Sequence, residues 1–381
     1  MQTVQRAYKY RFYPNQEQKM ILGRTFGCAR FVYNHFLRVR TDAFFNEGKR
    51  VGFNDTCLLL TELKQQPETI WLAECSNVVL QQSLRNLDTA FKNFFQGRAK
   101  YPAFKKKHAK QAARYTTSGF RWKHGEIWLA KMATPLDIRW SRSFTGEPSS
   151  VTVSKDAAGR YFISILVEEE VKPLPVVNQR VGIDLGLKDA LVQNNGTKIP
   201  NPTYLRKAET KLAKAQRRLA KKQKGSRNRA KARCKVARLH AKVQDCRNDF
   251  LHKTTTQLVR ENQVISAESL SIKNMVRNPC LAKAIHDVGW GELVRQLEYK
   301  AQWYGRTFVQ IDKWFPSSKR CHACGYVLES LDLSVRAWTC PACAAQHDRD
   351  VNAAQNTLDA GLAIIAGADK LRLHTEGHSG I

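Results

Sequence analysis

The stretch RVGIDLGLKDALVQNNG, residues 180–196, decides the fold of the second half of this chain. Its first part predicts a buried strand that contains Asp184, with Gly182 and Gly186 on either side, and its second part predicts another strand joined by a tight turn. An aspartate inside an apolar strand is unfavourable unless it is paired or binds a cation. Asp184 is therefore a candidate metal ligand, although pairing with a nearby arginine would explain the same position.

The segments that follow continue the pattern of an α/β domain. Residues 203–260 predict a long helical hairpin that breaks at Gly225 and Ser226. A short apolar strand then ends at Glu268, an amphipathic helix is expected over 281–305, and another strand precedes a cysteine-rich segment and a closing helix. The order strand, strand, helices, strand, helix, strand, helix is α/β, with the cysteine-rich segment as an insertion.

Three carboxylates occupy comparable places in this layout: Asp184 in the first strand, Glu268 at the end of a later strand and Asp350 at the head of the last helix. Phosphodiester hydrolysis by two Mg²⁺ or Mn²⁺ ions needs such a convergence, because hard cations prefer oxygen ligands and keep waters, one of which becomes the nucleophile. Asp350 could instead be the N-cap of the closing helix, and Asp348 could be that cap in its place. The three acids together predict a metal-dependent nuclease.

Four of the ten cysteines form two pairs, CHAC and CPAC, which fifteen residues separate. Two such pairs predict a structural Zn²⁺ site of the ribbon type with four thiolate ligands: Cys321, Cys324, Cys340 and Cys343. This closed set leaves His322 and His347 surplus. Gly325 follows the first pair, where a left-handed turn is usual, whereas Ala344 follows the second pair, so a slightly different second turn is expected.

The first hundred residues are predicted to be helical. Residues 14–107 place apolar side chains at three- and four-residue spacings, with aromatic side chains interleaved among basic and amide ones. On the helix that NVVLQQSLRNLDTAFKNFFQG (77–97) predicts, Phe91, Phe94 and Phe95 are expected mostly in the core. Three polar side chains of that helix could face solvent or a ligand: Gln81, Gln82 and Arg85.

Residues 115–172 change character, because apolar and polar residues alternate there around a hairpin turn predicted at 156–159. Short strands with such turns predict a small antiparallel barrel or sheet. QRAYKYRFYP near the N-terminus could add a strand to it, and the proline-containing VKPLPVVNQ reads as a linker that leaves it.

The formal net charge of +30 predicts a polyanionic partner. Between Arg206 and Arg238 the helical hairpin carries fifteen Lys or Arg and one acid, Glu209. Because like charges on a helix repel, phosphates are expected to neutralise this surface. A membrane surface is the competing partner, but no amphipathic basic helix, transmembrane-length apolar run or signal peptide stands out, so a cytoplasmic protein with no membrane partner is expected.

Five motifs in this order carry a resemblance to a known family: GIDLGLKDA, ISAESLSIKNM, FPSSKRCHACG, CPAC and HDRDVNAAQN. They resemble the RuvC-type nuclease and inserted zinc ribbon of the TnpB proteins of bacterial insertion sequences of the IS200/IS605 type, which are related to the Cas12 effectors. YRFYPNQEQ, LQQSLRNLDTAFKNFF and YPAFKKK resemble the N-terminal half of that family. The resemblance implies an RNA-guided DNA endonuclease whose guide RNA comes from the end of its own mobile element and pairs with target double-stranded DNA next to a short motif.

The resemblance also implies the architecture: an RNase H-like, RuvC-type α/β domain with an inserted zinc ribbon, a helical recognition region and a small wedge β-barrel. The expected boundaries are 1–13 and 115–172 for the wedge barrel, 14–114 for the recognition region, 173–179 for a linker, 180–314 for the nuclease domain including the hairpin 203–260, 315–346 for the zinc ribbon, 347–366 for the closing helix and 367–381 for a disordered tail.

Residue by residue, the resemblance places the catalytic acids on Asp184, Glu268 and Asp350, as ligands of two Mg²⁺ or Mn²⁺ ions, and the zinc ligands on the four paired cysteines. Asp348 is kept as a helix cap or as a residue that supports the metal ligands. The candidate nucleic-acid contacts are Gln81 and Gln82, on the helix that would read the short duplex motif, Arg85 on the same helix, the hairpin arginines Arg217, Arg218, Arg227 and Arg229, and Arg349, as a phosphate contact or ion-pair partner. A monomer without a small-molecule substrate is expected.

Two other classes fit parts of the sequence. A nuclease-inactive RNA-guided repressor on the same scaffold should lack one or more of the three acids, all of which are present here. A guide-free zinc-ribbon accessory protein that binds nucleic acid would not retain a defined RNA on purification.

Overall fold

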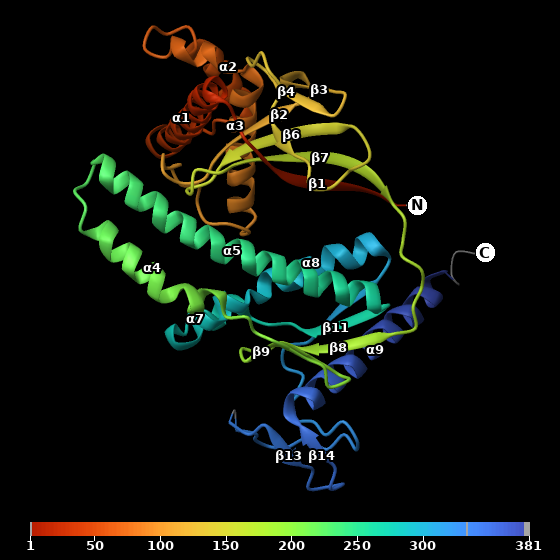
Figure 1. Cartoon of the computed structure of the whole chain (residues 1–381). Coiled ribbons are helices and arrows are strands. Elements are labelled where there is room, and N and C mark those ends of the chain that lie inside the picture. Colours follow the sequence, from red (N-terminus) through yellow and green to blue (C-terminus); the bar gives the residue numbers. More distant parts are fainter. Residues whose placement is uncertain (1, 333, 377–381) are drawn as a thin grey trace. The chain divides into compact units, whose positions relative to one another are not determined.

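A computed structural model describes residues 2–332 and 334–376 and divides the chain into two compact units (Figure 1). The N-terminal unit comprises Thr3–Glu170 together with Arg233–Arg238. The C-terminal unit comprises Val171–Ala232 and the chain from Leu239 onward. Within the described residues, no helix combines the length and the apolar composition that crossing a membrane requires.

Helices make up the first part of the N-terminal unit: α1 (Gln16–Glu47), α2 (Phe53–Leu63), the short 3-10 helix Ile70–Glu74 and α3 (Asn77–Phe95). The prediction of helices over this region is confirmed. A capping box begins α1, because the Gln18 N–H donates to the Asn15 side chain at 2.8 Å and the Asn15 N–H donates to the Gln18 side chain at 3.1 Å. Gly48, with φ of 66°, ends the helix in the left-handed conformation.

Strands of the same unit form a five-stranded sheet in the order β2-β6-β7-β1-β5. The strands are β1 (Gln2–Phe12), β2 (Gln111–Thr116), β5 (Ile138–Arg139), β6 (Pro148–Lys155) and β7 (Tyr161–Val171), and β3 (Phe120–Lys123) pairs separately with β4 (Glu126–Leu129). The predicted turn at 156–159 joins β6 to β7, which are antiparallel. The N-terminal segment adds a strand, as expected, and β2 begins at Gln111, before the predicted boundary at 115.

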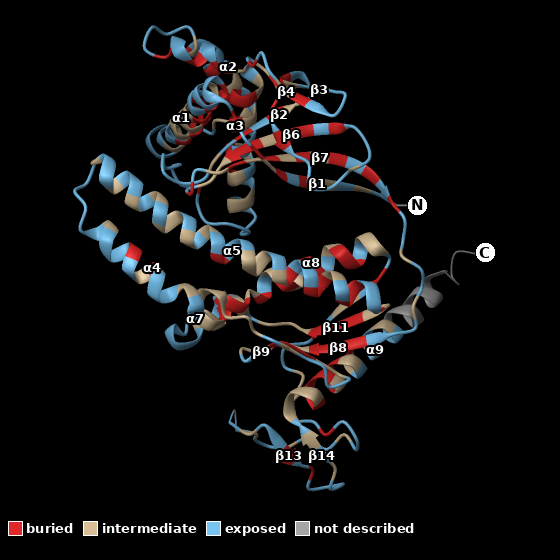
Figure 2. Cartoon of the chain, viewed as in Figure 1, coloured by how far each residue is buried: buried red, intermediate tan, exposed pale blue. Residues whose placement is uncertain are grey.

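One apolar core joins this sheet to α1 and α3. Alternate residues of β7 are buried, as the red bands on that strand show (Figure 2). Ile163, Ile165 and Val167 thereby enter the core with Leu80 and Leu84 of α3. The sheet and the helices therefore fold as one body.

The C-terminal unit contains a mixed five-stranded sheet in the order β10-β9-β8-β11-β12. Its strands are β8 (Arg180–Asp184), β9 (Asp189–Gln193), β10 (Lys198–Pro200), β11 (Val264–Glu268) and β12 (Thr307–Ile311). β11 runs parallel to both β8 and β12, and β9 is antiparallel to β8 and β10. The α/β prediction is confirmed, with β10 as a short strand that the sequence pattern did not reveal.

The helical hairpin consists of α4 (Tyr204–Ala220) and α5 (Arg227–Glu261) and breaks where predicted. Gly225 has a φ of 86°, and the Ser226 hydroxyl accepts from the Arg229 N–H at 3.1 Å to begin α5. The amphipathic helix predicted over 281–305 is instead two helices, α7 (Pro279–Val288) and α8 (Trp290–Tyr304), after the single-turn α6 (Ile272–Met275). Gly289, with φ of 78°, breaks the helix there although the apolar spacing continues.

The closing helix α9 (Arg349–Glu376) packs on β8 and β11 (Figure 1). Glycine makes this approach possible: a Cβ on Gly182 would lie 2.0 Å from the Ala354 carbonyl oxygen, and one on Gly361 would lie 2.0 Å from Ser266 Oγ. The helix continues past the predicted end at residue 366. The prediction of a disordered tail is therefore wrong up to Glu376, and the rest of that tail lies outside the described residues. The alanines, leucines and charged residues of α9 favour helix over disorder.

Candidate metal centres and nucleic-acid interface

The three predicted acids come together at one edge of the C-terminal sheet. Asp184 ends β8 and Glu268 ends β11, and these strands are parallel neighbours in which Ile183 pairs with Ala267. The carboxyl ends of both strands therefore lie side by side. α9, which packs on both strands, carries Asp350 in its first turn. Elements far apart in the sequence thus bring the three carboxylates to one place.

The electrostatics of Asp184 depend on the other two acids. Burial raises the pKa of Asp184 from its ordinary value of 3.8 to about 7, helped by the negative charges of Glu268 and Asp350 and opposed by Arg349 and Arg336. Neighbouring negative charges disfavour the ionised form of Asp184. The same charges attract a cation to this position. This arrangement fits divalent metal ions.

The carboxylates are spread more widely than the ligands of one small ion. In the described parts of the chain, the four paired cysteines alone bring three or more His, Cys, Asp or Glu ligand atoms within 4.8 Å of one another. Two ions held about 3.5–4 Å apart need ligands on both sides of the pair, so a wider carboxylate set suits them. Oxygen donors are also those that hard cations prefer.

Glu268 is tied to the loop that leads into the cysteine pairs. The Ser317 hydroxyl donates to Glu268 Oε1, and the Ser317 carbonyl accepts from the Asn356 side chain at 2.8 Å and from the Asn352 side chain at 3.4 Å. The same two amides donate to the Arg320 carbonyl at 2.7 and 2.8 Å. Ser317, Asn352 and Asn356 are buried. We call these four residues (Ser317, Arg320, Asn352 and Asn356) the latch, because they bind α9 to the loop that holds Glu268.

Asp348, rather than Asp350, caps α9. Its Oδ1 accepts from the N–H groups of Asp350 and Val351, both at 3.1 Å, and its Oδ2 lies 2.6 Å from Lys198 Nζ. Burial alone would raise the pKa of Asp348, but the Lys198 bond and the backbone N–H groups hold it below its ordinary value. The capping alternative for Asp350 is therefore wrong, and its carboxylate, 3.5 Å from Arg336, is available to the site.

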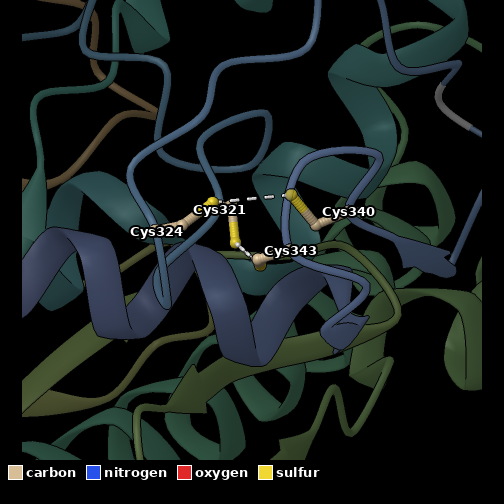
Figure 3. Close-up of side chains that lie close together, drawn as sticks. All are labelled: Cys321, Cys324, Cys340 and Cys343. Atoms are coloured by element: carbon tan, nitrogen blue, oxygen red, sulfur yellow. Dashed lines mark hydrogen bonds between the residues drawn. The ribbon is translucent and has the colours of Figure 1, made fainter.

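Four sulfur atoms form the second centre, and Figure 3 shows them facing one another. Cys321 Sγ lies 3.7 Å from Cys343 Sγ, and Cys324 Sγ lies 3.6 Å from Cys340 Sγ. With Zn–S bonds of about 2.3 Å, the edge of a tetrahedral four-sulfur site is about 3.8 Å. The cluster therefore has the dimensions of a zinc site. Its surroundings are a two-stranded sheet, β13 (Ala337–Thr339) with β14 (Gln346–Asp348), and a very small core.

Both cysteine pairs close with the same left-handed turn. Gly325 has a φ of 81° and Ala344 has a φ of 60°, and each N–H donates at 2.9 Å to the carbonyl of the cysteine that opens its pair. The expectation of a different second turn is wrong. The hydrogen bond and the cluster hold Ala344 in a backbone conformation that glycine adopts more readily.

Neither surplus histidine joins the four-sulfur set. His347 Nε2 lies 3.0 Å from Cys321 Sγ, and the His347 ring is 4.7 Å from the Trp338 ring. His322 Nδ1 lies 3.3 Å from Asp359 Oδ2 on α9. His322 therefore links the cluster to α9, and His347 can donate a hydrogen bond to a thiolate.

The candidate nucleic-acid contacts on α3 divide between two faces. Gln81 and Arg85 are exposed and Gln82 is half-buried, and the Arg85 guanidinium lies 4.8 Å from the centre of the Phe53 ring. A cavity of about 540 Å³ in the same unit is lined by α3 through Val79, Ser83 and Asn86. Basic side chains complete its wall: Arg30, Lys105, Lys110 and Arg114. The three predicted residues do not line this cavity.

The arginines of the hairpin and of α9 also divide. Arg217, Arg218 and Arg227 are exposed. Arg229 donates to the carbonyls of Leu219 and Lys222 at 3.1 and 2.6 Å and so caps the end of α4, and Arg349 donates to the carbonyls of Asp332 and Val335 at 2.7 and 3.4 Å. At least one nitrogen of each of these two guanidinium groups therefore bonds within the chain.

Sequence reasoning missed several residues that shape the site: Lys198, Ser317, Arg336, Asn352 and Asn356. The two asparagines carried a usable signal, because amides four residues apart fall on one helix face next to buried alanines. The other three contact the acids or the cap only through the tertiary fold, and no local pattern marks them.

Three family descriptions match the chain. Residues 163–279 match a family described as "Probable transposase", residues 290–357 match "Cas12f1-like, TNB domain", and residues 1–49 match "Helix-turn-helix domain". The last region folds here as strand β1 followed by the single long helix α1.

Similar proteins cover almost the whole chain. A Streptomyces pristinaespiralis protein named "Putative RNA-guided DNA endonuclease" is 52% identical over 99% of this chain and 94% of its own length. An Escherichia coli K12 protein named "Putative RNA-guided DNA endonuclease InsQ" is 33% identical over 94% of this chain and 93% of its own. The cryo-EM structure of a Cas12f1-sgRNA-target DNA complex has a chain that matches with a TM-score of 0.58 at 13% identity, over 93% of this chain and 98% of that one. The last match shows a shared fold.

Proposed function

The chain belongs to the TnpB family of RNA-guided DNA endonucleases, and we propose that it hydrolyses DNA through the carboxylates of Asp184, Glu268 and Asp350. The observation that carries this assignment is the convergence of the three acids: Asp184 and Glu268 end neighbouring parallel strands, and Asp350 lies in the first turn of the helix that packs on both. Burial and the charges of Glu268 and Asp350 raise the pKa of Asp184 although Arg336 and Arg349 oppose them, which supports a cation site at this point.

Mg²⁺ or Mn²⁺, when bound, supplies a water of lowered pKa and charge stabilisation for the leaving oxygen. The chain's own residues hold the ligands in place. Ser317 fixes one oxygen of Glu268 by a hydrogen bond, and Asp348 occupies the capping position that Asp350 would otherwise fill. Arg336, close to Asp350, balances part of the negative charge while leaving the acids ionisable.

The four cysteines are proposed to hold a structural Zn²⁺ ion. The sulfur spacing supports this, and so does the small size of the apolar cluster around Cys321, Trp338 and Cys340, which could not hold the segment 315–346 in one conformation by itself. We assign that segment as a zinc ribbon inserted into an RNase H-like, RuvC-type domain.

Family membership extends the proposal to the other parts and partners. The helices within 14–114 would form a recognition region, and the sheet built from 1–13 and 115–172 would form the wedge barrel. The guide RNA would come from the end of the element that encodes the protein, and the target would be double-stranded DNA next to a short motif. The protein would act in the cytoplasm, as a monomer. The likeness in fold to a Cas12f1 chain solved with guide RNA and target DNA supports this division of labour.

The exposed arginines of the hairpin, Arg217, Arg218 and Arg227, are proposed to contact phosphates. Gln81 and Gln82 remain the proposed readers of the short motif, and Arg85 remains a proposed nucleic-acid contact on the same helix. Arg229 and Arg349 would contact phosphates only through the guanidinium nitrogens that do not donate to backbone carbonyls.

The test begins with the purified protein. Sequencing the RNA that co-purifies should identify one defined RNA, and a plasmid matched to its guide should be cut when Mg²⁺ is added. Asp184→Ala should abolish cutting while RNA and DNA binding are preserved. Asp249→Asn, which removes an exposed acid from α5, is the matched control and should cut normally. Full cutting by Asp184→Ala would refute the catalytic assignment, binding without cutting by the wild type would indicate a repressor, and the absence of a defined RNA would indicate a guide-free protein.

A further inference from the structure

An aromatic groove lies at the C-terminal ends of α1 and α3 in the N-terminal unit. It has a volume of about 460 Å³, within the range of roughly 300–1,000 Å³ that is usual for ligand sites. Six rings line it and define the aromatic groove: Phe44, Phe45, Phe91, Phe94, Phe95 and Tyr101. No residue of the nuclease site or of the zinc cluster belongs to it.

The rings of the groove are unusually open to solvent. Phe95 is 76% exposed, Phe45 is 71% exposed and Phe44 is 51% exposed, whereas Phe91 is buried beneath them. The expectation that Phe95 lies mostly in the core is therefore wrong. Burial of a phenylalanine side chain stabilises a protein by roughly 1.5–3 kcal/mol, so a cluster of exposed rings is unfavourable for a chain that has no partner for it.

The charges around the rings decide which partner fits. Arg40, Lys49 and Arg50 line the groove, and no acid is among its lining residues in the described chain. Two of these cations pair with acids: Asp88 lies 3.5 Å from Arg40, and Glu47 lies 3.0 Å from Lys49. Arg50 is exposed beside the rings.

Flat exposed rings beside cations suit unpaired nucleobases. A base stacks on an aromatic face while its phosphate meets the neighbouring cation, and this mode tolerates any base because every base has such a face. A second copy of the chain suits the groove less well, since it would bring the same cations and a net charge of +30 against this surface.

We propose that the aromatic groove binds unpaired bases of a single nucleic-acid strand, which stack on Phe45 and Phe95 while Arg50 contacts the backbone phosphate. The groove shares no lining residue with the carboxylate centre or with the basic hairpin. The proposal depends on the proposed function at one point, because a guide RNA or a displaced DNA strand would supply the unpaired bases.

The experiment uses the full-length, zinc-loaded protein and short labelled strands of one sequence, as RNA, as DNA and as a duplex. Affinity is measured by fluorescence anisotropy at raised salt, which suppresses binding through phosphates alone. The double variant Phe45→Leu, Phe95→Leu keeps apolar side chains but removes the rings, and should weaken single-strand binding by about 5- to 100-fold with duplex binding unchanged. Phe45→Trp with Phe95→Trp should bind at least as tightly as the wild type.

Leu58→Ala is the matched control, because Leu58 is an exposed apolar residue of the same unit at 68% exposure and lies outside the groove. Loss for RNA alone would identify a guide RNA as the source of the bases, and loss for DNA alone would identify a displaced strand. Unchanged single-strand affinity in the leucine variant would overturn the proposal. So would self-association, seen by light scattering, that Phe95→Glu abolishes without changing strand binding, since it would assign the groove to a second copy.

Plasmid cutting is measured in parallel. A ring-dependent affinity in a protein that does not cut would uphold the groove and refute the nuclease assignment, whereas normal cutting with ring-independent affinity would do the reverse.

Discussion

Asp184→Asn should stabilise the C-terminal unit when no Mg²⁺ is bound, and by more as the pH rises. Burial, with the charges of Glu268 and Asp350, raises the pKa of Asp184 from 3.8 to about 7. An acid with a raised pKa binds its proton more tightly in the folded than in the unfolded state, so the folded state holds more protons between pH 4 and 7 and stability falls across that window as pH rises. Each pKa unit corresponds to about 1.4 kcal/mol, which gives an upper limit of about 4 kcal/mol at pH 8.

The asparagine keeps the shape of the side chain and cannot ionise, so its variant should lose none of this stability. Hydrogen exchange of the peptides that cover β8 and β11 measures the free energy of opening at the site itself. The variant should exceed the wild type by about 2–4 kcal/mol at pH 8, and the gap should shrink toward pH 4. Peptides from β6 and β7 in the N-terminal unit are the internal control and should not differ.

Added Mg²⁺ should reverse the order at pH 8, because the ion binds the ionised carboxylates of the folded wild type and finds one ligand fewer in the variant. A gap between variant and wild type that is independent of pH, or that grows as pH falls, would refute the reasoning. Either result would mean that Asp184 does not share a buried site with the other two acids.

Three further outcomes are expected. Ser317→Ala should lower plasmid cutting by about tenfold while zinc content, measured by atomic absorption, stays at one ion per chain, because Glu268 loses the hydroxyl that orients it. Ala344→Gly should raise resistance of the zinc ribbon to chelators, with about 1 kcal/mol gained by relieving the left-handed backbone at φ of 60°. Burial lowers the pKa of Lys300 to about 8, so above pH 8 the folded state holds fewer protons than the unfolded state. In calorimetry the wild type should therefore gain stability between pH 8 and 10 relative to Lys300→Met. Stability curves that stay parallel over this pH range would contradict the expectation.

Local patterns were enough to predict the elements that carry Asp184 and Glu268 and the helical hairpin. The apolar runs of β8 and β11 are short and end in an acid, and Gly225 with Ser226 interrupts a long helical period, so each of these features is written within a few residues. The break between α7 and α8 was missed because the apolar spacing continues across Gly289 while the backbone takes a φ of 78°. β10 was missed because a three-residue edge strand has no period to detect.

The surroundings of the acids could not be predicted in the same way. Arg336 and Ser317 reach Asp350 and Glu268 from another part of the chain, and nothing in the sequence between them records that contact. The prediction that Phe95 lies in the core was wrong for a related reason. Helical spacing indicates which face of α3 is apolar, but not where along that face the neighbouring elements stop covering it.

The place of the proposed zinc ribbon in the fold links the cysteine cluster to the three acids. The chain leaves the sheet after β12 and returns to it at α9. Just before the first cysteine pair, the Ser317 hydroxyl donates a hydrogen bond to Glu268. Just after the second pair, the Asp348 side chain accepts a hydrogen bond from the Asp350 N–H. The latch joins these ends through Asn352 and Asn356. Because the ribbon has almost no apolar core, a metal bound by the thiolates is what would keep that loop closed. A soft-metal site that takes no part in hydrolysis would thereby set the positions of two hard-metal ligands.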